Sequence, residues 1–252
     1  DIVLHEADWR SGIGWMMQHY PDYFYPANNL VYTIAGCASY SSYEGDFDIA
    51  KYKKMGFSLN WKSSFDFPYM GMFIPPVKTD TALWQKYKQW GVIVGDGYSS
   101  IQRLKNYSDL LRSKGFYTLS YFNIFEAGNN VQFPIPKRKA VSDADLWKDP
   151  NDFIYYQMKN ALLRPSPLKP YWYDCPIFSN WENAVAVDPA DTAYQNFLLH
   201  QARLHIDKIN PDGICIDRMD WITFYNSNGD DGISLHDGKK VRSLVFSWNN
   251  TM

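Results

Sequence analysis

The stretch SIQRLKNYSDLLRSKGFYTLSYFN, residues 100–123, contains in one piece the pattern that decides the fold. Its first part places Ile101, Leu104 and Leu111 at the spacing of one helix face. Gly115 then ends the helix, because glycine readily takes the left-handed conformation that follows a helix C-terminus. The apolar and aromatic run 116–122 comes next and predicts a strand. Residues 100–123 are therefore expected to form one helix–glycine–strand unit.

Two other segments repeat this unit. A short helix is expected over residues 48–55, with Gly56 at its end and a strand over 57–61. A longer helix is expected over 189–209, with Asp188 as N-cap and Pro189 as the first helical residue. The segment 210–213 ends that helix, and a strand over 213–217 follows. The buried stripe expected on the long helix consists of Leu198, Leu199, Ala202, Ile206 and Ile209.

Two more elements complete the pattern. Residues 31–35 are expected to form a strand before the first helix, and a fourth helix is expected after Lys239, with an apolar face made of Val241, Leu244, Val245 and Trp248. Strands that alternate with helices predict a parallel α/β sheet. The run 214–216 is continuously apolar, as in a strand covered on both faces. We expect parallel strands in chain order from residues 31–36, 57–61, 116–122 and 213–217.

The predicted fold class is a parallel (β/α)8 TIM-type barrel, of which residues 1–252 form one partial domain, the N-terminal half to two-thirds. An open edge is then expected beside the strand 214–216. The alternative is a doubly wound open sheet, but no glycine-rich phosphate-binding motif follows the first strand. Long aromatic loops after the strands also favour a barrel. The proline-rich connection 131–190 is expected to form a lid or small subdomain over the site.

The composition of the chain limits the classes of molecule that it is expected to bind. The chain has 252 residues, 25 basic and 27 acidic, which argues against a nucleic-acid partner. No stretch approaches 18 consecutive apolar residues, so no membrane span is expected. Aromatic residues make up 17%, with 10 Trp and 19 Tyr, which suits either sugar binding or an aromatic-rich core. The two ends are interpreted as cuts. The compartment stays open, with an extracellular or periplasmic location favoured, and the oligomeric state is not predicted.

Asp217 is the leading candidate for chemistry, because it ends the apolar run 214–216. Polar residues just past strand C-termini form the active site of a barrel. Arg218 beside it can keep the carboxylate ionised, as a nucleophile requires. The alternative is an Asp–Arg pair that only stabilises the rim.

Further candidates follow the same strand and its neighbours. Asn123 is expected to bond a sugar hydroxyl, and Glu126 to act as a general acid or a substrate ligand. The other expected substrate-binding residues are Trp61, Lys62, Asp66, Tyr121, Arg218 and Trp221. The alternative to substrate binding is that these loop residues only pack within their loops or carry a solvent-exposed charge. No HxH, HExxH or GxSxG pattern occurs, so neither a metal site, a cofactor nor a serine elbow is expected.

The segment DGICIDRMDW, residues 212–221, resembles the fourth-strand motif of retaining α-glycosidases with (β/α)8 barrels. These are the α-galactosidase-like enzymes, the endo-α-N-acetylgalactosaminidases and, more distantly, the α-amylases. The resemblance implies that Asp217 is the nucleophile. It also implies an acid/base residue from a later strand, beyond Met252. From the residues alone, Asp220 and Glu126 are further candidates for the second carboxyl group.

Three functional hypotheses remain open. The first is a retaining glycoside hydrolase that acts on an α-linked sugar or polysaccharide, with Asp217 as nucleophile and carbohydrate as its partner. The second is a barrel isomerase or lyase that uses Asp217 as a base. The third is a catalytically inactive barrel that binds carbohydrate.

Overall fold

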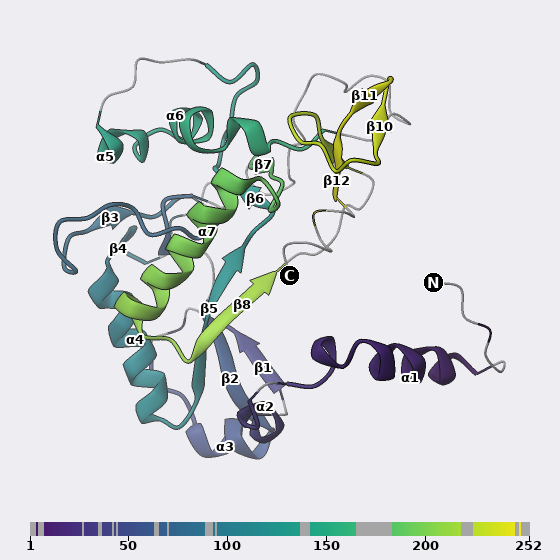
Figure 1. Cartoon of the computed structure of the whole chain (residues 1–252). Helices are drawn as coiled ribbons and strands as arrows, with labels where there is room; N and C mark the ends of the chain where they lie inside the picture. The colour runs from purple at the N-terminus through teal and green to yellow at the C-terminus, as the bar shows by residue number, and fades with distance from the viewer. Residues whose placement is uncertain are drawn as a thin grey trace.

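The computed structural model describes residues 4, 8–26, 28–34, 37–41, 43, 45–62, 66–69, 71–88, 93, 95–136, 142–164, 183–217, 224–244 and 247, with residues 33 and 62 described by their backbone alone. The centre of the fold is a four-stranded sheet in the order β1 (Cys37–Tyr40), β2 (Phe57–Lys62), β5 (Tyr117–Asn123) and β8 (Gly213–Asp217). All three strand pairs are parallel. The predicted mixed α/β fold, with parallel strands in chain order, is confirmed (Figure 1).

Helices cover one face of this sheet. The short α3 (Ile49–Lys54) joins β1 to β2, α4 (Ile101–Ser113) precedes β5, and α7 (Thr192–Leu204) precedes β8. Figure 1 shows α4 and α7 on the same side of the strands. The Asn60 side chain of β2 donates a 2.8 Å hydrogen bond to the Tyr107 hydroxyl of α4, which marks the face that these helices cover. Gly56 and Gly115 take positive φ angles of 84° and 75° after α3 and α4, as the sequence predicts.

The first strand lies further along the chain than predicted. Residues 31–33 belong to the short helix α2 (Leu30–Thr33), and β1 begins only at Cys37. The apolar run is not buried, since Val31 is 49% and Tyr32 64% exposed. The backbone N–H of Cys37 donates to the carbonyl of Gly56, which fixes the start of β1 beside β2. The sequence of β1 is less apolar than the run 31–35, so it was not recognised as a strand.

The third long helix also differs in detail. α7 begins at Thr192 with Asp191 as its N-cap, so the expectation for Asp188 and Pro189 is wrong. Its last turn becomes the π-helix η6 (His205–Ile209), and Asn210, with φ 56°, replaces glycine as the left-handed residue. Leu199 of α7 and Ile206 of the π turn are exposed, so neither belongs to the buried stripe that the sequence predicts.

Two polar side chains occupy the core face that apolar residues were expected to fill. The buried residues of α7 and η6 are Tyr194, Leu198, Gln201, His205 and Ile209. Gln201 accepts from the backbone N–H of Ile74 at 2.7 Å and donates to its carbonyl at 3.1 Å. His205 Nε2 lies 3.0 Å from the carbonyl of Met72. These bonds satisfy a buried segment outside the sheet, which explains why polar residues are tolerated there.

The connection after β5 contains short elements packed onto the core. They are β6 (Glu126–Ala127), α5 (Asp143–Leu146), α6 (Pro150–Phe153), the π-helix η3 (Ile154–Met158), η4 (Lys159–Ala161) and β7 (Val185–Ala186). β6 pairs antiparallel with β7. Phe153, Ile154 and Met158 are fully or almost fully buried in the largest apolar cluster, together with Phe73 and Tyr194. That this connection covers the site stays a prediction.

The segment 224–243 forms two small antiparallel pairs, so the expected fourth helix does not begin directly after Lys239. β10 (Leu235–His236) pairs with β11 (Lys239–Lys240), and β12 (Arg242–Ser243) pairs with β9 (Tyr225–Asn226). Leu244 and Ser247 are helical, whereas Val245 and Trp248 lie outside the described residues. The turn at Asp237 and Gly238, both with positive φ, favours the hairpin over a helix.

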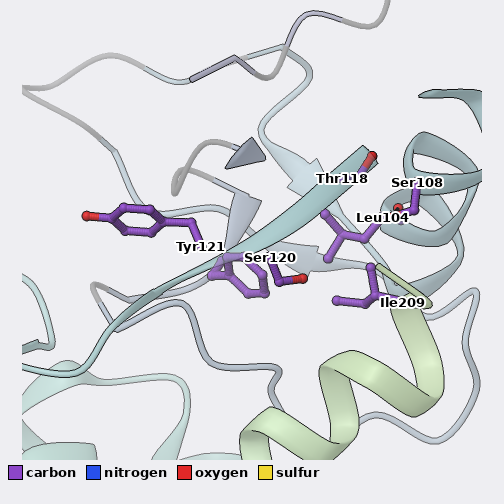
Figure 2. Close-up of a pocket in the computed structure, with 7 residues that line it drawn as sticks. Leu104, Ser108, Thr118, Ser120, Tyr121 and Ile209 are labelled. Carbon is purple, nitrogen blue, oxygen red and sulfur yellow. Dashed lines mark hydrogen bonds between the residues drawn. The ribbon is translucent and has the colours of Figure 1, made fainter. Parts of the chain in front are cut away.

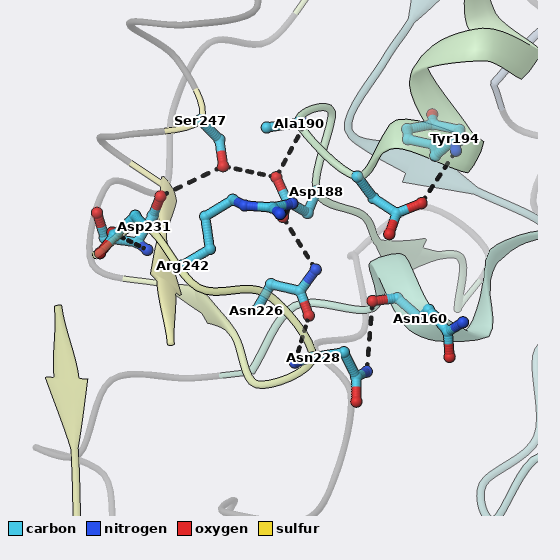
Figure 3. A network of polar contacts seen from close by, with 11 residues as sticks. Asn160, Asp188, Ala190, Tyr194, Asn226, Asn228, Asp231, Arg242 and Ser247 are labelled. Carbon is cyan, nitrogen blue, oxygen red and sulfur yellow. Dashed lines mark hydrogen bonds and ion pairs between the residues drawn. The ribbon is translucent and has the colours of Figure 1, made fainter. Parts of the chain in front are cut away.

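Asp188 holds this segment to the body of the protein. Its fully buried carboxylate accepts hydrogen bonds from Asn226 Nδ2 at 2.9 Å, Arg242 Nη1 at 3.1 Å and Ser247 Oγ at 2.6 Å (Figure 3). The backbone N–H of Ala190 donates to it as well. The carboxylate therefore joins the start of the α7 region to the C-terminal hairpins.

The remaining elements lie at the margins. β3 (Trp84–Gln85) pairs with β4 (Tyr98–Ser99) in a small antiparallel hairpin. The N-terminal helix α1 (Trp9–His19) and the short η1 (Pro21–Tyr23) bury none of their residues, and α1 extends away from the sheet in Figure 1. Among the described residues, no helix has the length and apolar character needed to cross a membrane.

Among the described residues, β8 is an outermost strand of the four-stranded sheet, at the edge where the sequence analysis expects an open side. Its residues are less covered than predicted for a strand buried on both faces, because Ile216 is 51% exposed and the rest are half-buried.

Candidate functional site

A tyrosine and a carboxylate meet at the C-terminal ends of β5 and β8. The Tyr121 hydroxyl donates a hydrogen bond to Oδ2 of Asp217. Alternation along β5 and the register Asn123↔Asp217 direct Tyr121 and Asp217 to the face opposite α4 and α7. Tyr121 is 8% exposed and Asp217 is half-buried. Tyr121 thus fixes one oxygen of the carboxylate, and within the described residues no hydrogen bond reaches the other, Oδ1.

Two more aromatic rings extend the cluster across the sheet. The Tyr40 ring at the end of β1 lies 5.6 Å from the Tyr121 ring and 5.9 Å from the Trp61 ring, centroid to centroid. Tyr40 is 48% exposed. Tyr40, Trp61 and Tyr121 therefore form a row of rings that ends at Asp217, which we call the strand-end cluster.

The electrostatics keep Tyr121 a hydrogen-bond donor. Burial raises the pKa of the Tyr121 hydroxyl far above its ordinary value, and the bond to Asp217 and the negative charges of Asp217 and Glu126 raise it further. Burial and the Asp217 charge also raise the pKa of the Cys215 thiol, two residues earlier on β8. Tyr121 and Cys215 therefore both stay protonated beside Asp217.

Asn123 and Glu126 lie close to this cluster but are enclosed. Asn123 Nδ2 donates to Glu126 Oε2 at 2.6 Å, and Asn123 Oδ1 accepts from the backbone N–H groups of Phe125 and Glu126 at 3.1 and 3.0 Å. Asn123 is 1% exposed and Glu126 is fully buried. In this conformation the pair holds the turn that leads from β5 into β6.

The structure places Asp66 away from the strand-end cluster. Its carboxylate forms a buried ion pair with Lys86 at 2.8 Å, and its carbonyl accepts from Trp84 Nε1 at 2.6 Å. Asp66 thus fastens the loop after β2 to the β3–β4 hairpin. The Lys62 side chain and the residues Arg218, Asp220 and Trp221 lie outside the described residues.

Tyr40 is the one residue of the cluster that the sequence analysis missed. The aromatic residue at the end of the first strand was the available signal. Placing that strand at 31–35 instead of at β1 removed Tyr40 from the strand ends.

A cavity on the helix side of β5 shares only Tyr121 with the strand-end cluster. It measures about 10 Å³ and is lined by Phe67, Leu104, Ser108, Thr118, Ser120, Tyr121 and Ile209. In Figure 2 the Tyr121 ring extends away from Leu104, Ser108 and Ile209, toward the opposite side of the strand. A volume of this size holds about one water molecule, so it cannot take a sugar.

In the part of the chain that the structure describes, no group of three or more His, Cys, Asp or Glu side chains is arranged to hold a metal ion. What the strand-end cluster provides is a single carboxylate, a hydroxyl donor and aromatic surface.

No protein-family model and no curated protein sequence matches the chain. Among solved structures, the chain is similar to a cycloisomaltooligosaccharide glucanotransferase of Paenibacillus sp. complexed with cycloisomaltoheptaose, with a TM-score of 0.46 and 16% identity over 79% of this chain and 26% of that one. An uncharacterized protein of Listeria monocytogenes, complexed with α-D-glucose, β-D-glucose, magnesium and calcium, gives 0.42 and 12% over 79% and 18%. A noncanonic maltogenic α-amylase of Thermotoga neapolitana gives 0.37 and 12% over 73% and 39%. The chain spans about a quarter of the glucanotransferase, and two of these three structures carry the names of carbohydrate-active enzymes.

Proposed function

We propose that this chain carries the nucleophile of a retaining glycoside hydrolase that acts on an α-linked sugar or polysaccharide. The observation that carries the proposal is the bond between Tyr121 and Asp217 at the C-terminal ends of adjacent parallel strands. The active sites of parallel (β/α)8 barrels lie at that end. The four strands β1, β2, β5 and β8 are then half of such a barrel.

The geometry suits nucleophilic attack by one carboxylate oxygen. Oδ1 of Asp217 bonds to the anomeric carbon while the glycosidic bond breaks and an acid protonates the departing oxygen. Water then hydrolyses the resulting glycosyl ester and releases Asp217. Because Tyr121 holds Oδ2, the carboxylate has one orientation before the reaction, which lowers the entropic cost of reaching the transition state.

Tyr40 and Trp61 supply a surface for the sugar. Flat aromatic rings pack against the C–H faces of a sugar ring, and the polar tip of Tyr40 can bond a hydroxyl. Tyr40 is 48% exposed at the end of β1, two strands from β5. We assign these two residues to substrate binding.

One observation favours the alternative of a barrel that only binds carbohydrate. Glycoside hydrolysis requires a second carboxyl group, and Glu126 is fully buried against Asn123. The acid is then Asp220 or a residue of a further strand, and if neither supplies it the cluster binds sugar without cleaving it.

A covalent trapping experiment tests the proposed role. The chain, or a longer protein that contains it, is incubated with a slow-turnover fluoroglycosyl fluoride of α configuration, and the labelled peptide is sequenced by mass spectrometry. We expect one glycosyl adduct on Asp217, and none in the Asp217→Asn variant. Turnover of the reagent without any adduct on Asp217, or an adduct on another residue, would contradict the nucleophile role. Binding of the reagent with neither turnover nor adduct would support the binding-only alternative.

A further inference from the structure

A second, larger hollow lies on the loops around β3, α5 and α6. It is a groove of about 730 Å³ whose lining includes residues 83–88, 129, 130, 132, 144 and 147–151. These segments follow β2 and β5 in the chain, so the groove belongs to the loops at the C-terminal ends of the strands. The residues of the strand-end cluster are not part of its lining.

Unpaired amide side chains are the first notable feature of this groove. Gln85, Asn129, Asn130 and Gln132 line it, and within the described residues none of their side-chain amides forms a hydrogen bond. The backbone at Gln132 is held by its N–H, which donates to Asn151 Oδ1 at 2.7 Å. An amide both donates and accepts, which is the pairing that sugar hydroxyl groups require.

A supported aromatic ring is the second feature. Trp147 is half-buried and lines the groove. Its ring stacks on Tyr69 at 6.0 Å and 18°, and contacts Phe153 at 4.6 Å. The Tyr69 hydroxyl donates to the carbonyl of Trp147. The indole is therefore held in place from behind, so that binding on its outer surface costs little conformational entropy.

The charges of the groove are balanced. Lys86 pairs with Asp66 at 2.8 Å, and Lys148 pairs with Asp145. Of the remaining charged residues in the lining, Lys88 is positive and Asp149 is negative. A groove without net charge does not select an anion or a cation, whereas free amides beside an aromatic ring select an uncharged, hydroxyl-rich ligand.

We propose that this groove binds a neutral oligosaccharide segment, separately from the strand-end cluster. The Trp147 ring stacks on one sugar unit, and Gln85 and Gln132 bond hydroxyls from two sides. The groove then holds a polysaccharide chain on the protein independently of bond cleavage.

Affinity electrophoresis tests the proposal. The protein migrates through gels that contain soluble starch, dextran or galactomannan, with dextran sulfate as the charged comparison. We expect at least one neutral polysaccharide to retard the protein, and Trp147→Ala to weaken that retention about tenfold, the effect of losing one aromatic contact. Gln85→Ala and Gln132→Ala should each weaken it less. Trp9→Ala, at a tryptophan that is 70% exposed on α1, and Gln157→Ala, at an exposed amide on η3, are the matched controls.

Three outcomes would overturn the proposal: no retention by any neutral polysaccharide, equal retention of Trp147→Ala and the native protein, or stronger retention by dextran sulfate than by the neutral gels. Turnover of a short activated aryl glycoside, which reaches only the strand-end cluster, tests the proposed function independently of binding in the groove. Loss of retention with unchanged aryl-glycoside turnover concerns the groove alone. Loss of turnover in Asp217→Asn with unchanged retention concerns the nucleophile alone.

Discussion

Tyr121 and Asp217 lie on adjacent parallel strands, and the tyrosine hydroxyl donates to one oxygen of the carboxylate. The bond joins residues that are distant in sequence, and it forms only because β5 and β8 pair in register. Its position at the strand C-termini gives each partner a separate, testable part in the proposed reaction.

Asp217→Asn removes the attacking oxygen with almost no change in size. We expect turnover of an activated aryl α-glycoside to fall by several orders of magnitude, because the loss affects the transition state more than the ground state. Sugar binding and the melting temperature should stay close to those of the native protein. A folded, sugar-binding Asn variant with near-normal turnover would rule out the nucleophile role. A drop in stability of about 1–3 kcal/mol, with activity lost only in proportion to unfolding, would indicate a structural carboxylate.

Tyr121→Phe keeps the ring beside Tyr40 and removes only the hydroxyl. A lost hydrogen bond to a charged group corresponds to about 1.5–3 kcal/mol, so kcat should fall about 10- to 100-fold while KM changes little. Steady-state kinetics on the aryl glycoside measure kcat and KM separately. Tyr117→Phe, on the same strand, is the matched control. Equal kinetics of the two variants would show that the bond does not position Asp217.

Tyr40→Ala tests the aromatic surface. Because Tyr40 is 48% exposed, we expect the free energy of unfolding to change by less than about 1 kcal/mol. KM should rise about tenfold through the lost stacking contact, with kcat nearly unchanged. Tyr23→Ala, at a tyrosine that is 72% exposed in η1, should alter neither parameter. A fall in kcat alone would assign Tyr40 to the chemical step.

The parallel sheet could be predicted from the sequence, whereas parts of the site could not. The units that end at Gly56 and Gly115 combine helical spacing, a left-handed glycine and an apolar run, and these local signals agree with one another. The position of Asp217 at the end of β8 could be predicted for the same reason, since it is the polar end of an apolar run.

The errors arose where tertiary contacts outweigh local pattern. Gln201 and His205 face the core, where backbone groups at Ile74 bond the Gln201 amide and the Met72 carbonyl bonds Nε2 of His205. No spacing of apolar residues reveals such partners. Asp188 has the sequence of a helix N-cap, but its carboxylate is used by Asn226, Arg242 and Ser247. The ring contacts of Tyr40 with Trp61 and Tyr121 likewise arise only when the strands pair, so the local sequence does not reveal them.

Asp188→Asn should destabilise the protein by about 3 kcal/mol, because Arg242 would keep a largely buried charge without its partner. Denaturant unfolding measures the change, and limited proteolysis should show earlier cleavage within 224–247. Asp191→Asn is the matched control, since asparagine also caps a helix well. Equal stability of the two variants would show that the Asp188 network contributes nothing.

The buried His205 leads to a prediction of how the free energy of unfolding changes at acidic pH. Burial lowers its pKa to about 3, in spite of the bond to the Met72 carbonyl. The unfolded chain, with an ordinary histidine pKa of about 6.5, therefore binds a proton that the folded protein does not. Stability should fall as pH drops from about 6.5 toward 3, by up to about 1.4 kcal/mol per pH unit.

His205→Phe keeps a ring between Phe67 and Phe122 and removes this titration. The slope of unfolding free energy against pH should then decrease by about one proton. His200→Gln, at an exposed position on α7, should leave the slope unchanged. An unchanged slope in the phenylalanine variant would contradict the assignment.

The outer side of β8 has a practical consequence. In the described part of the chain β8 pairs with β5 alone, and Ile216 is 51% exposed. Free N–H and C=O groups along a strand with exposed apolar side chains are a template for another extended chain. We therefore expect concentrated preparations of the isolated 252-residue chain to self-associate by intermolecular strand addition, and a lysine in place of Ile216 to reduce that aggregation.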